Sequence, residues 1–193
     1  MEQLQGEWHG LKENMPRYYK CGFCGCTTAS KMAFSTNVNA TLVAIYICSG
    51  CNRPTFLEYE QQTPAPILGN SVEHLPDEIE QLYSQARRCT QVEAYTACIM
   101  VCRKILMHVA VQKGAKTKLS FFEYVEYLSS NGYVPPDGKG WVNHIRDKGN
   151  EANHEIVIMS STDALELLSF IEMLLKFVYE FPASIMPPQG NKT

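Results

Sequence analysis

The sequence has 193 residues, of which 45% are hydrophobic, and a formal net charge of -3. This length allows one ordinary domain plus a small appendage, and the hydrophobic fraction excludes a disordered polar chain. The charge and an isoelectric point near 6.0 exclude a strongly basic nucleic-acid-binding protein, so any contact with nucleic acid must be local. The N-terminus lacks the features of a signal peptide, and no apolar run approaches the roughly 18 residues of a membrane span. We therefore expect a cytoplasmic protein without a membrane partner.

In the first third of the chain, the sequence predicts a polar lead-in followed by β structure. Residues 1–20 are polar with a few scattered aromatic side chains, and we interpret them as a segment that packs locally on the next part of the chain. Residues 31–60 contain three β-rich segments separated by polar turns, as expected for short strands in hairpins. These segments read KMAFSTNV, TLVAIYIC and PTFLEYE. A stretch with Pro64, Pro66 and Gly69 comes next and indicates a linker.

Four of the eight cysteines form two Cys-x-x-Cys motifs, one from Cys21 to Cys24 and one from Cys48 to Cys51. Each motif can place two sulfurs on one ion, and the glycine inside each lets backbone N–H groups turn toward the thiolates. Since a mostly strand-forming segment joins the two motifs, their spacing predicts a zinc ribbon that binds one Zn²⁺ per chain. Four protein sulfurs leave no open position for water, so this ion would be structural.

The alternative interpretation of the two motifs is a redox-active Cys-x-x-Cys site. The redox motif of thioredoxin, however, occurs once per chain and opens a helix in a βαβ unit, which this sequence lacks.

The four cysteines outside the two motifs have separate interpretations. Cys26 could compete as a ligand, but only one residue separates it from Cys24, so we place it outside the four-sulfur shell. Cys89, Cys98 and Cys102 fall on or beside apolar helical stripes, which favours a packing role.

Helical patterns dominate the rest of the chain. They predict helices at 76–90, 92–112, 119–131, 140–156 and 161–180. The last should close at Pro182, with a flexible tail behind it. The whole pattern predicts a mainly α protein with a small β zinc ribbon, followed by a helical bundle of about five helices. The boundaries we assign are 1–62 for the ribbon with its lead-in, 63–75 for a linker, 76–182 for the bundle and 183–193 for the tail.

The predicted helix at 140–156 has one apolar stripe and one polar face. The polar face carries Asn143, Arg146, Asn150 and His154. The last three are spaced four residues apart, so a phosphate-sized anion could meet a guanidinium, an amide and an imidazole together. A solvated face is the alternative interpretation, although asparagine is a poor helix former and such a face would more naturally use Glu, Lys or Gln.

A series of short motifs carries a family resemblance. After the first Cys-x-x-Cys motif come Leu75-Pro76, Tyr83-x-x-Ala86, Ala94-Tyr95, Arg103, Ile145-Arg146, Gly149-Asn150, Ala152-x-His154 and Asp163-Ala164. In this order the chain resembles, over most of residues 20–182, a bacterial family catalogued as domain of unknown function 4145. That family is similar to the HEPN superfamily, helical domains of bacterial toxin, CRISPR and phage-defence systems. Many of them are metal-independent ribonucleases that act as dimers.

The resemblance implies a HEPN-like bundle and a homodimer formed through the polar helix. In HEPN nucleases an arginine, usually a following polar residue, and a histidine four to six residues later project into a cleft between two protomers. The histidine moves a proton and the arginine holds the scissile phosphate. Here Asn150 and His154 match, but Gly149 occupies the arginine position and Arg146 lies one helical turn earlier. With the arginine one turn away, the side chains can still bind an anion together, but they are less well placed for efficient catalysis.

A second pair, Arg103 and His108, also satisfies the bare arginine-to-histidine spacing. It lies on the apolar second helix, where Arg103 is better explained by pairing with a carboxylate. We therefore keep the polar helix as the candidate site.

These residues support three functional hypotheses. In the first, the protein binds RNA, a nucleotide or a protein partner in a bacterial defence or toxin-type system, without efficient catalysis. In the second it is a metal-independent HEPN endoribonuclease, with Arg146, Asn150 and His154 as catalytic residues. In the third it is a purely structural dimerisation module. The missing arginine at position 149 and the acidic isoelectric point favour the first.

Overall fold

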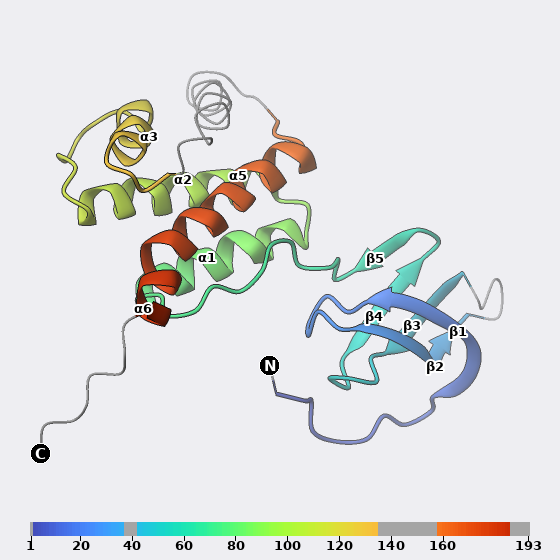
Figure 1. Cartoon of the computed structure of the whole chain (residues 1–193). Helices are drawn as coiled ribbons and strands as arrows, with labels where there is room; N and C mark the ends of the chain where they lie inside the picture. Colours follow the sequence, from blue (N-terminus) through green and yellow to red (C-terminus); the bar gives the residue numbers. More distant parts are fainter. Residues whose placement is uncertain (1, 37–41, 135–157, 186–193) are drawn as a thin grey trace, which may run out of the picture. The chain divides into compact units, whose positions relative to one another are not determined.

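The computed structural model describes residues 2–36, 42–134 and 158–185 (Figure 1). The chain divides into two compact units, Met1–Ile67 and Leu68–Thr193. Our prediction for the helix at 140–156 lies outside the described residues, as do most of the tail and the end of the KMAFSTNV segment. Among the helices that the structure does describe, none has the length and apolar character needed to cross a bilayer.

The first unit is a five-stranded antiparallel sheet in which each strand pairs with the next along the chain. The strands are β1 (Lys12–Lys20), β2 (Thr27–Ser35), β3 (Val43–Ile47), β4 (Pro54–Glu58) and β5 (Gln61–Thr63). Tyr46 in the central strand pairs with Ala33 on one side and with Thr55 on the other. Its side chain is fully buried, because alternating residues of a strand point to opposite faces and this face carries the core of the sheet.

The predicted strands in residues 31–60 are present as β2, β3 and β4, and the polar lead-in packs on the next part of the chain, but as a paired strand that was not predicted. Its second half is β1, which pairs with β2 from Lys12↔Ala33 to Lys20↔Thr27. The register shifts between Glu13 and Arg17, around Pro16, which has no N–H to give to a ladder. An edge strand with one buried residue shows no alternation of apolar and polar residues, so the sequence pattern did not reveal it.

The second unit is helical. It contains α1 (Asp77–Thr90), α2 (Tyr95–Gln112), α3 (Phe121–Ser130) and α5 (Ser161–Leu175). Helix α2 lies at its centre and packs against the other three, and Cys98 and Cys102 on α2 are fully buried, in agreement with their predicted packing role. The first turns of α3 and α5 are closed by reciprocal capping boxes at Ser120 and Ser160, which satisfy N–H groups that a helix leaves unpaired.

The last helix does not stop where the sequence predicted. Helix α5 continues through a π-helical turn (Lys176–Glu180) into α6 (Phe181–Ile185). Pro182 therefore lies in the first turn of α6 rather than beyond the helix end.

The predicted fold class, a mainly helical protein with a small ribbon and about five helices, is wrong. A five-stranded antiparallel sheet spans 12–63, and in the described residues four helical segments follow it, the last running from α5 into α6. The error arose at β1 and β5, whose polar sequences made the sheet look smaller than it is. The sheet is an architectural layer of its own rather than an appendage.

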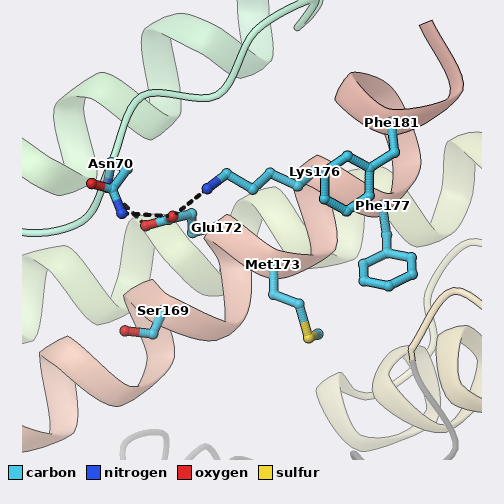
Figure 2. A pocket seen from close by; sticks show the side chains of 7 residues that line it. All are labelled: Asn70, Ser169, Glu172, Met173, Lys176, Phe177 and Phe181. Atoms are coloured by element: carbon cyan, nitrogen blue, oxygen red, sulfur yellow. Dashed lines mark hydrogen bonds and ion pairs between the residues drawn. The ribbon is translucent and has the colours of Figure 1, made fainter. Parts of the chain in front are cut away.

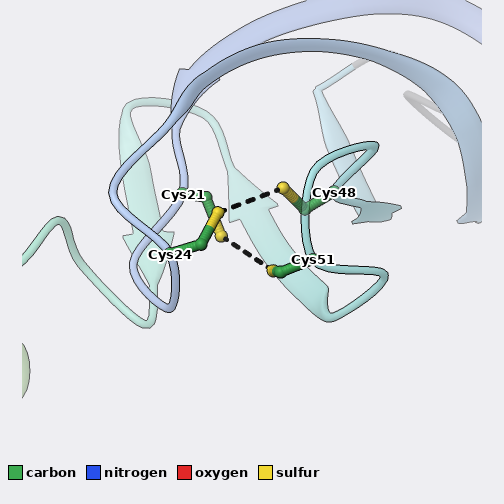
Figure 3. Close-up of side chains that lie close together, drawn as sticks. All are labelled: Cys21, Cys24, Cys48 and Cys51. Atoms are coloured by element: carbon green, nitrogen blue, oxygen red, sulfur yellow. Dashed lines mark hydrogen bonds between the residues drawn. The ribbon is translucent and has the colours of Figure 1, made fainter. Parts of the chain in front are cut away.

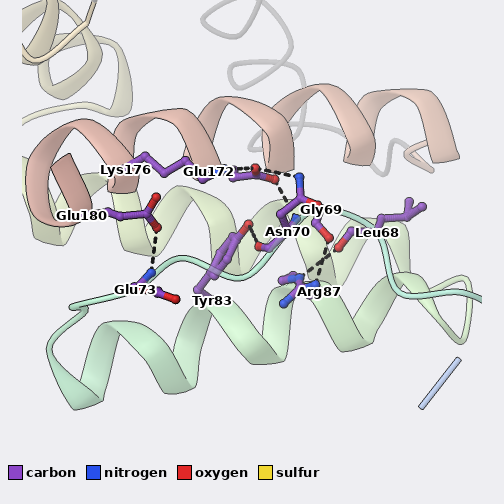
Figure 4. A network of polar contacts seen from close by, with 9 residues as sticks. All are labelled: Leu68, Gly69, Asn70, Glu73, Tyr83, Arg87, Glu172, Lys176 and Glu180. Atoms are coloured by element: carbon purple, nitrogen blue, oxygen red, sulfur yellow. Dashed lines mark hydrogen bonds and ion pairs between the residues drawn. The ribbon is translucent and has the colours of Figure 1, made fainter. Parts of the chain in front are cut away.

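A polar network holds the extended segment 68–73 on the helices of the second unit (Figure 4). The Glu172 carboxylate accepts hydrogen bonds from the backbone N–H and side-chain amide of Asn70, at 2.8 and 2.9 Å, and from Lys176 at 2.7 Å. Arg87 on α1 donates to the carbonyls of Leu68 and Gly69, at 3.0 and 2.9 Å. The segment's backbone groups thus find partners on two helices before α1 begins.

Glu172→Gln should weaken this attachment. Burial raises the pKa of Glu172, but the bonds from Lys176 and Asn70 outweigh it and hold the pKa below 4.5. The charged form therefore stabilises the fold above pH 4.5, and this contribution is lost as the pH falls below that value. We expect Glu172→Gln to cost about 1–2 kcal/mol at neutral pH. The difference from wild type, measured by denaturant unfolding with far-ultraviolet circular dichroism, should shrink in acid. A difference independent of pH would contradict this assignment.

Candidate metal centre

The four cysteines of the two Cys-x-x-Cys motifs gather at one end of the sheet unit (Figure 3). Cys21 directly follows β1 and Cys48 directly follows β3, while Cys24 and Cys51 lie in the turns that lead into β2 and β4. Three of the four are almost fully buried and Cys24 is partly exposed. All four sulfurs lie within 4.8 Å of one another, so together they could hold a metal ion.

The sulfur positions fit a tetrahedral ion. The Sγ atoms of Cys21 and Cys51 are 3.7 Å apart, and so are those of Cys24 and Cys48. A regular tetrahedron with metal–sulfur bonds of about 2.3 Å has sulfur–sulfur edges of about 3.8 Å. The site is therefore the right size for a four-coordinate ion, and four thiolates would leave it no further position.

The two turns that present the cysteines are built alike. In each, the N–H of the first cysteine donates to the carbonyl five residues later, Cys26 at 2.9 Å in one turn and Arg53 at 3.0 Å in the other. The residue after the second cysteine donates back to the carbonyl of the first at 2.9 Å in both. That residue has a left-handed φ, +73° at Gly25 and +58° at Asn52, which glycine and asparagine tolerate best.

Gly22 lets another part of the chain approach the first turn. A Cβ atom at this position would lie 2.5 Å from the carbonyl oxygen of Pro64 and 2.6 Å from that of Ala65. Both atoms belong to the backbone, so neither can rotate away. The glycine in the first motif thus serves close packing as well as the turn.

A fifth sulfur lies against the cluster. The Sγ atom of Cys26 is 3.0 Å from that of Cys24 and 3.7 Å from that of Cys48. Burial raises the pKa of Cys24, but hydrogen bonds from the Cys26 thiol and from its backbone N–H outweigh it and lower the pKa to about 6. The same contact raises the pKa of Cys26 to about 12, with burial adding to it. Of these two sulfurs, Cys24 therefore has the greater thiolate character.

The other candidate residues fall elsewhere. Asn143, Arg146, Asn150 and His154 lie outside the described residues. The second candidate arginine, Arg103, is buried with its guanidinium 4.1 Å from the centre of the Phe121 ring. Burial lowers its pKa.

A shallow pocket of about 350 Å³ lies beside the polar network of the helical unit (Figure 2). Its polar wall is Glu172, which Asn70 and Lys176 already bind. Its other wall carries Phe177 and Phe181, whose ring centroids are 5.4 Å apart in an edge-to-face contact. Since its charged groups are paired with each other, this pocket offers mainly aromatic surface and is a weaker candidate than the cysteine cluster.

Comparison with known proteins supports the family resemblance. A family model described as "Domain of unknown function (DUF4145)" matches residues 84–189. No curated protein and no solved structure matches the chain. The match begins within α1, covers most of the helical unit and does not extend to the cysteine cluster.

Removing the metal should unfold the sheet and spare the helices, because each unit has its own core. Trp8 can report on the sheet, since its indole N–H donates to the carbonyl of Asn52 at 3.0 Å, next to Cys51. In a Trp141→Phe background, a chelator or Cys21→Ser should shift Trp8 emission to the red while far-ultraviolet circular dichroism keeps its helical signal. Simultaneous loss of both signals would show that the two units fold as one.

The two glycines of the first turn should respond differently to substitution. Gly22→Ala would force backbone apart and should cost about 1–3 kcal/mol of the unfolding free energy followed by Trp8. Gly25→Asn, the matched control, places in the first turn the residue that Asn52 provides in the second, and should change stability by less than about 1 kcal/mol. Equal effects of the two substitutions would contradict the packing role of Gly22.

Proposed function

This chain belongs to the family described as Domain of unknown function (DUF4145), and on that premise we propose that it is a zinc-stabilised, RNA-binding or nucleotide-binding protein. We place it in a bacterial defence or toxin-type system, acting as a homodimer and without efficient catalysis. The observation that carries the metal part of the proposal is the four-sulfur cluster, and the RNA-binding part rests on the polar series of the sequence. A site whose four positions are all protein sulfurs scaffolds a surface and does not activate water.

We infer zinc as the resident ion, one per chain. Tetrahedral sites of four thiolates suit zinc or iron, since soft sulfur ligands select both. The small core of the sheet favours a structural ion, because such units draw on metal binding to fold. Elemental analysis of purified protein should return one zinc per chain and no iron.

The sheet offers a contact surface for a ligand. Phe34 pairs with Ile45, and Ile45 pairs with Phe56, so the three side chains form one row on the same face of the sheet. Ile45 is 37% exposed and Phe56 is 38% exposed. A row of partly exposed apolar side chains is typical of surfaces on which bases stack or a partner protein packs.

The phosphate groups of the RNA or nucleotide would be bound by the polar side chains of residues 143–154. Arg146, Asn150 and His154 recur every four residues, and a two-fold dimer would bring two copies together, concentrating positive charge that an acidic monomer lacks. Asn143 extends the same face. Gly149 in place of an arginine favours binding over turnover. The endoribonuclease alternative assigns proton transfer to His154 and phosphate binding to Arg146.

Arg146→Ala and His154→Ala should each weaken binding of a fluorescein-labelled single-stranded RNA by about tenfold at low salt, and by less at high salt. Fluorescence anisotropy measures the affinity. Arg88→Ala and His9→Ala are matched controls, because both residues are exposed and neither belongs to the polar series. Melting temperatures of all four variants should stay near that of wild type.

The other outcomes separate the rival functions. Metal-independent cleavage of RNA that leaves cyclic-phosphate ends and disappears in His154→Ala would establish the endoribonuclease. Affinity unchanged by both substitutions would overturn the proposed site. If sedimentation of the same variants showed loss of a dimer without loss of RNA affinity, the polar residues would form a dimerisation contact.

A further inference from the structure

The cysteine cluster contains one sulfur more than a tetrahedral ion uses. Cys26 Sγ lies 3.0 Å from Cys24 Sγ and 3.7 Å from Cys48 Sγ, so it rests against one edge of the four-sulfur tetrahedron. The 3.7 Å separation equals that between Cys24 and Cys48 themselves. Cys26 is thus as close to Cys48 as a ligand would be.

The turn does not require a thiol at position 26. The equivalent residue in the second turn is Arg53, and both residues serve their turns through backbone groups: a carbonyl that accepts from the first cysteine and an N–H that donates to the second. The Arg53 side chain lies over the ring of Phe23, 5.4 Å from its centre. Since the second turn forms with an arginine here, the thiol of Cys26 must be explained by what its sulfur contacts.

Gly50 provides the space that Cys26 occupies. A Cβ atom at position 50 would lie 2.8 Å from Cys26 Sγ, closer than such atoms approach in proteins. The same Cβ would be 3.7 Å from the sulfurs of Cys24 and Cys48, which is an ordinary contact. The missing side chain therefore admits the fifth sulfur and leaves the neighbouring pair unaffected.

We propose that Cys26 is a reserve ligand, which replaces Cys24 so that the ion can be held by Cys21, Cys26, Cys48 and Cys51. Replacement avoids the short chelate that one intervening residue would impose if both bound together. As the bond from Cys26 to the ion forms, its thiol releases a proton, and the departing Cys24 thiolate takes one up. The coordination number, the net charge and the oxidation state of the ion stay the same.

This inference rests on the metal occupancy proposed above and not on RNA binding. It makes Cys24 the ligand that Cys26 replaces, because the Cys26 sulfur is 3.0 Å from that of Cys24 and 3.7 Å from that of Cys48. Cys21 has no such neighbour among the described sulfurs, because the two contacts of Cys26 are with Cys24 and Cys48. Loss of Cys24 and loss of Cys21 should therefore have unequal consequences.

Titration of the metal-free full chain with Co²⁺ tests the proposal, since the intensity of the sulfur-to-cobalt charge-transfer band counts the thiolates bound. Cys24→Ser should bind one ion with a four-thiolate band and an affinity within about tenfold of wild type. Cys21→Ser should show at most three thiolates and lose about a hundredfold or more. Cys24→Ser/Cys26→Ser should behave like Cys21→Ser, and Cys26→Ser like wild type.

Gly50→Ala is the matched control, because it displaces Cys26 without removing a thiol. Alone it should keep the four-thiolate band and an affinity within about tenfold of wild type, because Gly50 has no positive φ and alanine can adopt its backbone conformation. Combined with Cys24→Ser it should reduce the band to three thiolates and lower the affinity toward that of Cys24→Ser/Cys26→Ser. Trp8 emission and far-ultraviolet circular dichroism, recorded for each variant before Co²⁺ is added and at saturating Co²⁺, would report separately whether the sheet and the helices are folded.

Two results would overturn the reserve role. One is a three-thiolate band and a hundredfold loss in Cys24→Ser, equal to those of Cys21→Ser. The other is a four-thiolate band that survives in Cys24→Ser/Gly50→Ala. If the wild-type chain bound no Co²⁺ at all, the metal occupancy itself would be wrong, a failure that the wild-type titration alone identifies.

Discussion

The sheet unit depends on four sulfurs meeting at one point. Its hydrophobic core is small, and three of the eight residues that form it are themselves cysteines of the cluster. So small a core buries little apolar surface to set against the conformational entropy that folding removes. An ion bound by Cys21, Cys24, Cys48 and Cys51 would join the turn after β1 to the turn after β3 and so fix both hairpins. The hydrogen bonds of the two turns, and the close approach of Pro64 and Ala65 to Gly22, hold the four cysteines in position.

The helical unit has an independent source of stability. Its core extends over α1, α2, α3 and α5, and Glu172 and Arg87 tie the segment before α1 to that core through backbone hydrogen bonds. The family match falls on this unit. Because the two units are stabilised differently, we propose different roles for them. The N-terminal sheet provides a contact surface stabilised by the metal, and the C-terminal unit provides the polar series Arg146, Asn150 and His154.

Strong periodicity allowed most elements to be predicted from the sequence. Strand β4 and most of β3 alternate inward and outward residues around Tyr46, whereas β2 was recognised by its composition, since its alternation breaks at Lys31 and Met32. Helices α1, α2, α3 and α5 repeat apolar residues at helical spacing or begin at recognisable caps. Strand β1 was missed because an edge strand needs only one buried face and one partner, which β2 supplies. The helix continued past Pro182 because a π-turn placed that proline in a first turn, a backbone event that no local pattern indicates.

The sequence by itself determined which four cysteines gather at one point, because two Cys-x-x-Cys turns can close one tetrahedral site wherever strands bring them together. It also determined the family, through the order of short motifs along the helices. Only the tertiary structure decided the place of Cys26. One-residue spacing argued that it lies outside the shell, yet Gly50, which is distant in sequence, leaves room for its sulfur beside Cys24. Contacts of this kind depend on the fold of the whole sheet, so spacing along the chain cannot supply them.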